Sequence, residues 1–71
     1  MQDEDLKKIG KRLRELRIEK GFTSYENFAM EYDLSRRFYW SIEKGNNFTM
    51  TYLLKILKIH NISLKDFINS L

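Results

Sequence analysis

The side chains of this chain that could do chemistry are mainly basic groups and hydroxyls, with Arg36 and Arg37 adjacent near the middle. The chain has no cysteine and one histidine, His60, so it offers no thiolate nucleophile and cannot assemble a zinc site with the usual four side-chain ligands. It also lacks a glycine-rich phosphate loop and any evident serine or carboxylate constellation around His60. We therefore expect no enzymatic activity, no cofactor and no metal.

Arg36 and Arg37 open a predicted short helix that ends at Gly45. A guanidinium group can donate two hydrogen bonds to O6 and N7 of guanine, which discriminates against other bases by about 1–3 kcal/mol. The same groups could instead grip phosphates or stay solvated. The DNA major groove admits one helix, whose exposed N-terminal residues reach the base edges. This geometry nominates as base-contacting residues Ser35, Arg36, Arg37, Trp40 and Ser41.

Three consecutive aromatic residues, Phe38, Tyr39 and Trp40, follow the two arginines. Neighbours on a helix are separated by about 100° around its axis, so the three rings cannot all face one core and at least one is exposed. An exposed ring could contact a thymine methyl group or pack against sugar and backbone. Equally, Phe38 and Trp40 could join a peripheral cluster with Phe48 and Tyr52.

A second set of polar residues flanks this helix and could fix its register on a phosphate backbone. Helix N-termini have free backbone amides that are ready sites for phosphate. Each of these residues could also be an ordinary cap or turn residue. The candidates for phosphate contact are Thr23, Ser24, Tyr25, Lys44, Asn46, Asn47 and Thr49.

Five helices are predicted to position these residues. Apolar residues recur three and four apart from Leu6 to Leu16, which predicts an amphipathic helix ending at Gly21. Gly10 lies inside that helix, where a small residue could let another helix approach. Asp33 tolerates a left-handed backbone and suits a tight turn between the second and third helices. The predicted N-caps of the four later helices are Thr23 or Ser24, Ser35, Thr49 and Ser63.

The composition indicates one small globular domain over residues 1–71, with residues 1–5 forming a disordered N-terminal tail. Hydrophobic residues make up 42% of the chain and charged residues 32%, which is unlike a disordered protein. Thirteen Lys and Arg against ten Asp and Glu give a net charge of +3, which permits nucleic-acid binding without requiring it. The apolar runs are too short to span a membrane and the charged start does not resemble a secretory signal, so we expect a cytoplasmic protein.

Residues 24–29, 34–37 and 42–45 together resemble the helix-turn-helix of the Cro/C1-type, or xenobiotic-response-element, family of regulators. Residues 10–21 are similar to the first helix of that family, and residues 53–57 and 61–64 to its fourth helix and the entry to its fifth. The resemblance covers roughly residues 9–68. Two positions depart from the family pattern: Tyr25 stands where glutamine is usual, and Asp33 where the turn usually has glycine.

The resemblance implies an all-α, compact five-helix bundle of the phage-repressor type, with helices 2 and 3 as the helix-turn-helix. It also implies a sequence-specific regulator of transcription, of the stand-alone repressor or controller type, whose third helix enters the major groove of double-stranded DNA. The resemblance further implies that Tyr39 and Ile42 face inward, and that Arg17 and Glu43 form an ion pair linking the first helix to the end of the recognition helix. We expect neither a membrane partner nor a small-molecule ligand.

Such small domains usually bind palindromic operators as symmetric homodimers. The apolar residues at the C-terminus exceed what a short helix needs for its own core contact, although simple core packing is the alternative. The residues expected at the dimer interface are Ile62, Leu64, Phe67, Ile68 and Leu71.

A protein-binding module of the same fold, similar to an antitoxin or anti-repressor, is the alternative function. In that case an exposed Phe38 and Trp40 would meet protein instead of DNA. The basic pair Arg36 and Arg37 favours nucleic acid, and a steep fall of affinity with added salt would distinguish the two functions.

Overall fold

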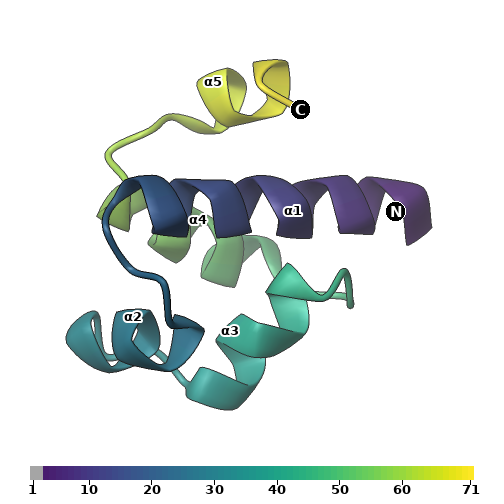
Figure 1. The fold of residues 1–71 in the computed structure, drawn as a ribbon. Coiled ribbons are helices and arrows are strands. Elements are labelled where there is room, and N and C mark those ends of the chain that lie inside the picture. The colour runs from purple at the N-terminus through teal and green to yellow at the C-terminus, as the bar shows by residue number, and fades with distance from the viewer. Residues whose placement is uncertain (1–2) are drawn as a thin grey trace.

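The structure is a computed structural model that describes residues 3–71, and within this range it contains five α-helices and no strand. The elements are α1 (Asp3–Glu19), α2 (Tyr25–Glu31), α3 (Arg36–Glu43), α4 (Met50–Ile59) and α5 (Leu64–Asn69). In Figure 1, α1 and α4 cross the middle of the molecule, with α2 and α3 at one end and α5 at the other. The predicted all-helical class and the number of helices are confirmed.

Short polar side chains begin each of the four later helices. At each N-cap a hydroxyl oxygen accepts a hydrogen bond from the backbone amide three residues on, which satisfies one of the free donors in the first turn. These oxygens belong to Ser24, Ser35, Thr49 and Ser63, at 3.1–3.3 Å from their amides. Of the two caps considered for α2, the structure uses Ser24.

Helix α1 begins at Asp3, so the predicted disordered tail is wrong for residues 3–5, while residues 1 and 2 lie outside the described range. The first turn of α1 contains Asp3, Glu4 and Asp5. Their negative charges interact favourably with the positive end of the helix dipole. Leu6, at the next position, is buried and anchors this turn to the core.

The core receives side chains from all five helices and from the turn before α3. From the apolar face predicted for α1 it includes Ile9 and Leu13, and Leu16 packs against it partly buried. The fully buried large side chains are Tyr39, Phe28, Phe67, Leu13, Ile42, Leu53, Ile56 and Leu57. Tyr39 and Ile42 of α3 both face this core, as expected from the family resemblance.

The tight turn between α2 and α3 is held by a left-handed residue. Asp33 has φ 55°, a conformation that aspartate tolerates better than most residues, and the sequence predicted a turn at this position. Leu34, the next residue, is 7% exposed and its amide donates to the Ala29 carbonyl at 2.7 Å. This bond and the burial of Leu34 fix the angle at which α3 leaves α2.

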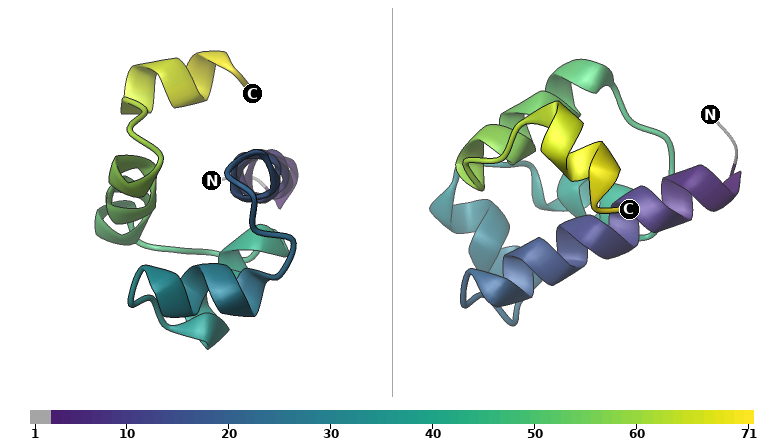
Figure 2. Two further views of the ribbon diagram at one scale, coloured as in Figure 1. Left: turned by 60° about the vertical axis from the view of Figure 1, so that its left-hand side comes forward. Right: turned by 90° about the horizontal axis from the view of Figure 1, so that it is seen from above.

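Gly10 of α1 lies directly against the backbone of the last turn of α3. A Cβ atom at this position would lie 2.5 Å from the carbonyl oxygen of Ile42 and 2.6 Å from that of Glu43. No side chain larger than a hydrogen atom fits there without movement of backbone. The absence of a side chain at Gly10 therefore sets how closely α3 is held against α1, and the left view of Figure 2, which looks along α1, shows the two helices side by side.

None of the five helices described is long and apolar enough to cross a membrane.

Candidate nucleic-acid interface

Helix α3 presents its polar residues on the face turned away from the core. With Tyr39 and Ile42 buried, helical geometry places Arg37 and Ser41 on the opposite face. Arg36 and Arg37 are exposed, and Ser35, which caps the helix, is exposed beside them. The structure therefore brings the predicted base-contacting residues together on one outward surface.

Phe38 and Trp40 lie on opposite flanks of this surface, since one precedes and the other follows the buried Tyr39 by about 100°. Phe38 is 64% exposed and Trp40 39% exposed. The Trp40 ring stacks on Tyr25, with the ring centroids 4.3 Å apart and an interplanar angle of 19°. The ammonium group of Lys44 lies 5.7 Å from the centre of the Trp40 ring. Tyr25 and Trp40, predicted for separate roles, are thus in direct contact.

The orientation of α3 is braced by the ion pair expected between Arg17 and Glu43. Nε of Arg17 lies 2.7 Å from Oε2 of Glu43 and Nη2 lies 3.1 Å from Oε1, while Nη1 donates to the Phe22 carbonyl at 2.8 Å. The two side chains are only 5% and 1% exposed. The hydrogen bonds to Glu43 raise the pKa of Arg17, so the guanidinium stays charged. The pair ties the last turn of α3 to α1 and to the loop after α1.

The candidates for phosphate contact fall into two groups on either side of α3. Thr23, Ser24 and Tyr25, at the start of α2, line a depression on the Trp40 flank. On the Phe38 flank, Asn47 and Thr49 line a second depression that includes the start of α4. Lys44 lines the first depression, and Asn46 is exposed in the connection between α3 and α4.

Sequence reasoning missed Arg14, which lines the same depression as Tyr25, Trp40 and Lys44. Arg14 is exposed on α1, more than ten residues from the helix-turn-helix in sequence. Its only signal in the sequence was its place in a run of basic residues. Its position beside the start of α2 depends on the packing of α1.

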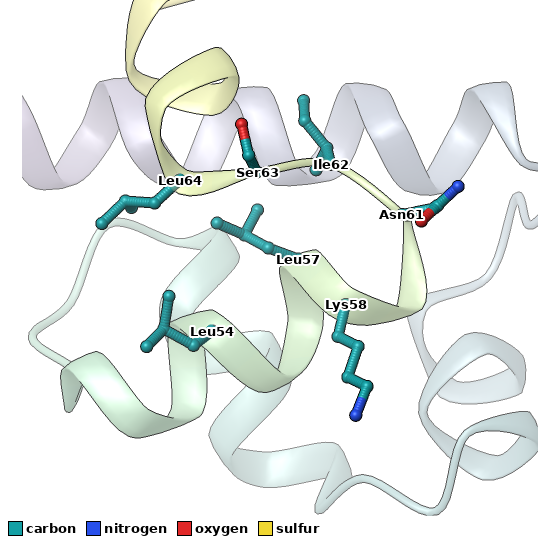
Figure 3. A pocket seen from close by; sticks show the side chains of 7 residues that line it. All are labelled: Leu54, Leu57, Lys58, Asn61, Ile62, Ser63 and Leu64. Atoms are coloured by element: carbon teal, nitrogen blue, oxygen red, sulfur yellow. The ribbon is translucent and has the colours of Figure 1, made fainter.

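The residues expected at a dimer interface do not share one environment. Phe67 is fully buried in the core, so its assignment to an interface is wrong: the core-packing alternative holds for this residue because α5 closes over α1 and α4 through it. Ile68 and Leu71 are 48% and 46% exposed. Ile62 and Leu64 are half-buried, and they line a groove between α4 and α5, shown in Figure 3, with Leu54, Leu57, Lys58, Asn61 and Ser63.

Comparison with known proteins connects this arrangement with a function. The chain is 40% identical over 60 residues to the control protein C.MunI of a Mycoplasma species, and this match covers 83% of the chain and 81% of its relative. This chain belongs to the restriction-modification controller proteins. The crystal structure of the controller protein C.AhdI from Aeromonas hydrophila is similar to it with a TM-score of 0.76 at 35% identity, covering 90% of this chain and 97% of that one. No protein-family model matches the chain.

Controller proteins are regulators with a Cro/C1-type helix-turn-helix, which confirms the predicted family resemblance. This controller protein is therefore a DNA-binding regulator of transcription and not an enzyme, as predicted from its sequence. Exposed arginines at the start of α3 and the braced opposite face of that helix agree with this function.

Proposed function

We propose that this controller protein acts in the cytoplasm as a homodimer on a palindromic operator, with α3 of each protomer in the major groove. The observation that carries the proposal is that α3 has one face held rigidly and the other free. Tyr39 and Ile42 are buried, Gly10 allows α1 close to the C-terminal end of the helix, and Glu43 is tied to Arg17. A helix held in this way loses little entropy when it enters a groove.

Base recognition is assigned to the outward face of α3. Arg37 and Ser41 lie near its centre, and Arg36 stands at its N-terminal end beside Ser35. Either arginine can form the bidentate contact to guanine. Trp40 contributes from the flank, where its stack on Tyr25 holds the ring beside the groove-facing residues.

Phosphate contacts on both sides of α3 would fix the position of the helix in the groove. On the Trp40 flank they come from Thr23, Ser24 and Tyr25. The remaining phosphate contacts are assigned to the residues between the end of α3 and the start of α4, which are Lys44, Asn46, Asn47 and Thr49. Lys44 lies on the Trp40 flank, and Asn47 and Thr49 lie on the Phe38 flank, so candidates occupy both sides of one helix, which suits the two backbones that border a groove.

The dimer contact is assigned to the end of the molecule opposite α2 and α3. Ile62, Leu64, Ile68 and Leu71 remain available there, and Leu54 of α4, 45% exposed, lines the groove that contains Ile62 and Leu64. A two-fold axis at this end would present both α3 helices to half-sites about one helical turn apart.

Selection of bound sequences from random duplexes tests the base contacts. We expect the wild type to select a palindrome, and Arg36→Ala or Arg37→Ala to lose preference at one base pair in each half-site, with about tenfold weaker binding or more. Both side chains are exposed, so neither variant should unfold.

Lys8→Ala is a matched control, because it removes one exposed positive charge from α1, a helix that carries neither the proposed base contacts nor the proposed dimer contact. This variant should select the same sequence as the wild type. If both arginine variants also selected that sequence with unchanged affinity, the assignment of α3 would be wrong.

A further inference from the structure

A partly apolar pocket opens on the Phe38 flank of α3. Its walls come from α3, from the connection to α4 and from α4 itself. We call it the aromatic pocket, and its residues are Phe38, Ser41, Asn47, Phe48, Thr49 and Tyr52.

The base of the aromatic pocket is preformed. Phe48 and Tyr52 are half-buried and pack against the main core, which holds their rings in place. The hydrogen bond from the Phe48 amide to Oδ1 of Asn47, at 3.0 Å, and the cap that Thr49 provides for α4 order the connection that carries them. A ligand entering the pocket therefore meets a surface that needs little rearrangement.

The outer wall is Phe38, whose exposure has no structural explanation in the fold. At 64% exposed it is one of the most exposed large apolar side chains described. Trp40, on the other flank, has Tyr25 as a stacking partner, whereas Phe38 stacks on no aromatic ring in residues 3–71. A hollow lined by aromatic side chains and a few polar groups, as here, is typical of a binding site.

The position of the pocket restricts what this surface can bind. Phe38 directly follows Arg37, and Ser41 belongs both to the pocket and to the proposed groove-facing surface. In the major groove the bases present hydrogen-bonding groups and one apolar group, the C5-methyl of thymine. The methyl group is thus the feature of DNA that matches an apolar wall at this position.

We infer that the aromatic pocket receives the C5-methyl group of a thymine in each half-site, and that Phe38 makes this controller protein selective for thymine at that position. The inference rests on the proposed function, because it requires α3 to lie in the major groove. It adds an apolar determinant of specificity to the polar contacts of the two arginines.

Replacing single thymines of the selected operator by uracil tests the inference, since uracil keeps the pairing and the hydrogen-bonding edge and lacks only the methyl group. We expect one thymine in each half-site at which uracil weakens wild-type binding about fourfold, the ratio that corresponds to burying one methyl group. Phe38→Ala should bind the thymine and uracil duplexes equally, while circular dichroism shows that it remains folded.

Met30→Ala is the control, because Met30 is 69% exposed on α2 and lies outside the pocket. This variant should keep the wild-type preference for thymine. If Phe38→Ala binds too weakly to measure, Phe38→Leu is compared on the same duplexes: a changed ratio of thymine to uracil affinity supports the inference, and an unchanged ratio overturns it.

The inference is also overturned if replacing each thymine by uracil leaves the affinity of the wild type unchanged. It is equally overturned if Phe38→Ala shows the same ratio of thymine to uracil affinity as the wild type. Either result would leave the proposed function standing as long as Arg36→Ala or Arg37→Ala loses base preference. The preference for thymine over uracil and the base preference that depends on the two arginines can therefore be lost independently.

Discussion

Arg17 and Glu43 form a buried ion pair whose partners depend on each other. Replacing Glu43 by glutamine removes the charge that compensates the buried Arg17 guanidinium and turns one of the two acceptor oxygens into an NH2 donor that faces it. We expect Glu43→Gln to lower the free energy of unfolding by about 3 kcal/mol or more, measured by urea denaturation.

Glu15→Gln is the matched control, since Glu15 pairs with Arg12 at 3.3 Å and is 48% exposed. An exposed pair contributes about 1 kcal/mol at most. Equal losses of unfolding free energy in the two variants would show that burial does not make the Arg17–Glu43 pair more important for stability than an exposed pair.

His60 makes the stability of the domain depend on pH. Its ring stacks on Phe28 with centroids 5.4 Å apart, and its buried Nε2 has no hydrogen-bond partner within residues 3–71. Burial lowers the pKa of His60 below its ordinary 6.5, and the nearby positive charge of Lys20 lowers it further.

As pH falls below 6.5, the unfolded chain takes up a proton that the folded state still resists, so stability falls with pH. The stability that neutral His60 contributes is fully present above about pH 6.5. It is lost progressively as the pH falls to the pKa of His60 in the folded protein. Unfolding free energies of the wild type and His60→Gln, measured between pH 5 and 8, should differ in slope below about pH 6.5. Parallel curves would contradict this dependence.

At the scale of the elements, the contact between α1 and α3 reverses the usual effect of glycine in a helix. Alanine normally stabilises a helix interior by about 1 kcal/mol relative to glycine. At Gly10, however, a methyl group would meet the Ile42 carbonyl oxygen at 2.5 Å. We expect Gly10→Ala to destabilise the domain by about 1–3 kcal/mol and to weaken DNA binding, because α3 must shift away from α1.

Thermal unfolding and a DNA-binding titration check this prediction together. Lys11→Ala, at the neighbouring exposed position of α1, should have little effect on stability. A stabilised Gly10→Ala variant would mean that the two helices can separate at no cost.

At the scale of the whole molecule, the two opposite ends of the domain carry different surfaces. α2 and α3 carry the residues proposed to face DNA, α5 carries the exposed Ile68, and the exposed Leu71 follows α5. We expect Ile68→Asp combined with Leu71→Asp to yield a folded monomer, because neither side chain is fully buried and two carboxylates oppose burial against a second copy. Operator affinity should fall at least tenfold, since the two half-sites are then bound independently.

Analytical ultracentrifugation of the wild type and this double variant measures the mass directly. Met30→Asp, on α2, is the control and should keep the mass of the wild type. A wild type and a double variant of the same mass would contradict the assignment of the dimer contact to α5.

The helices and their beginnings could be predicted from sequence because the signals are local. A serine or threonine side chain caps the backbone three residues later, and apolar spacing of three and four marks one face of a helix. The turn at Asp33 has the same origin, since its left-handed backbone depends on the residue itself. The pairing of Arg17 with Glu43 came from the family resemblance and not from any local signal.

Tertiary structure alone decided which apolar and polar faces are covered. Periodicity could not show that Phe67 fills the core while Ile68 stays exposed. It also could not show that Trp40 stacks on Tyr25 while Phe38 has no stacking partner among the described residues. Nor could it show that Gly10 lies against the carbonyl groups of α3. Local sequence determines a helix and the direction of its side chains. What lies opposite each side chain depends on how segments distant in the sequence pack together.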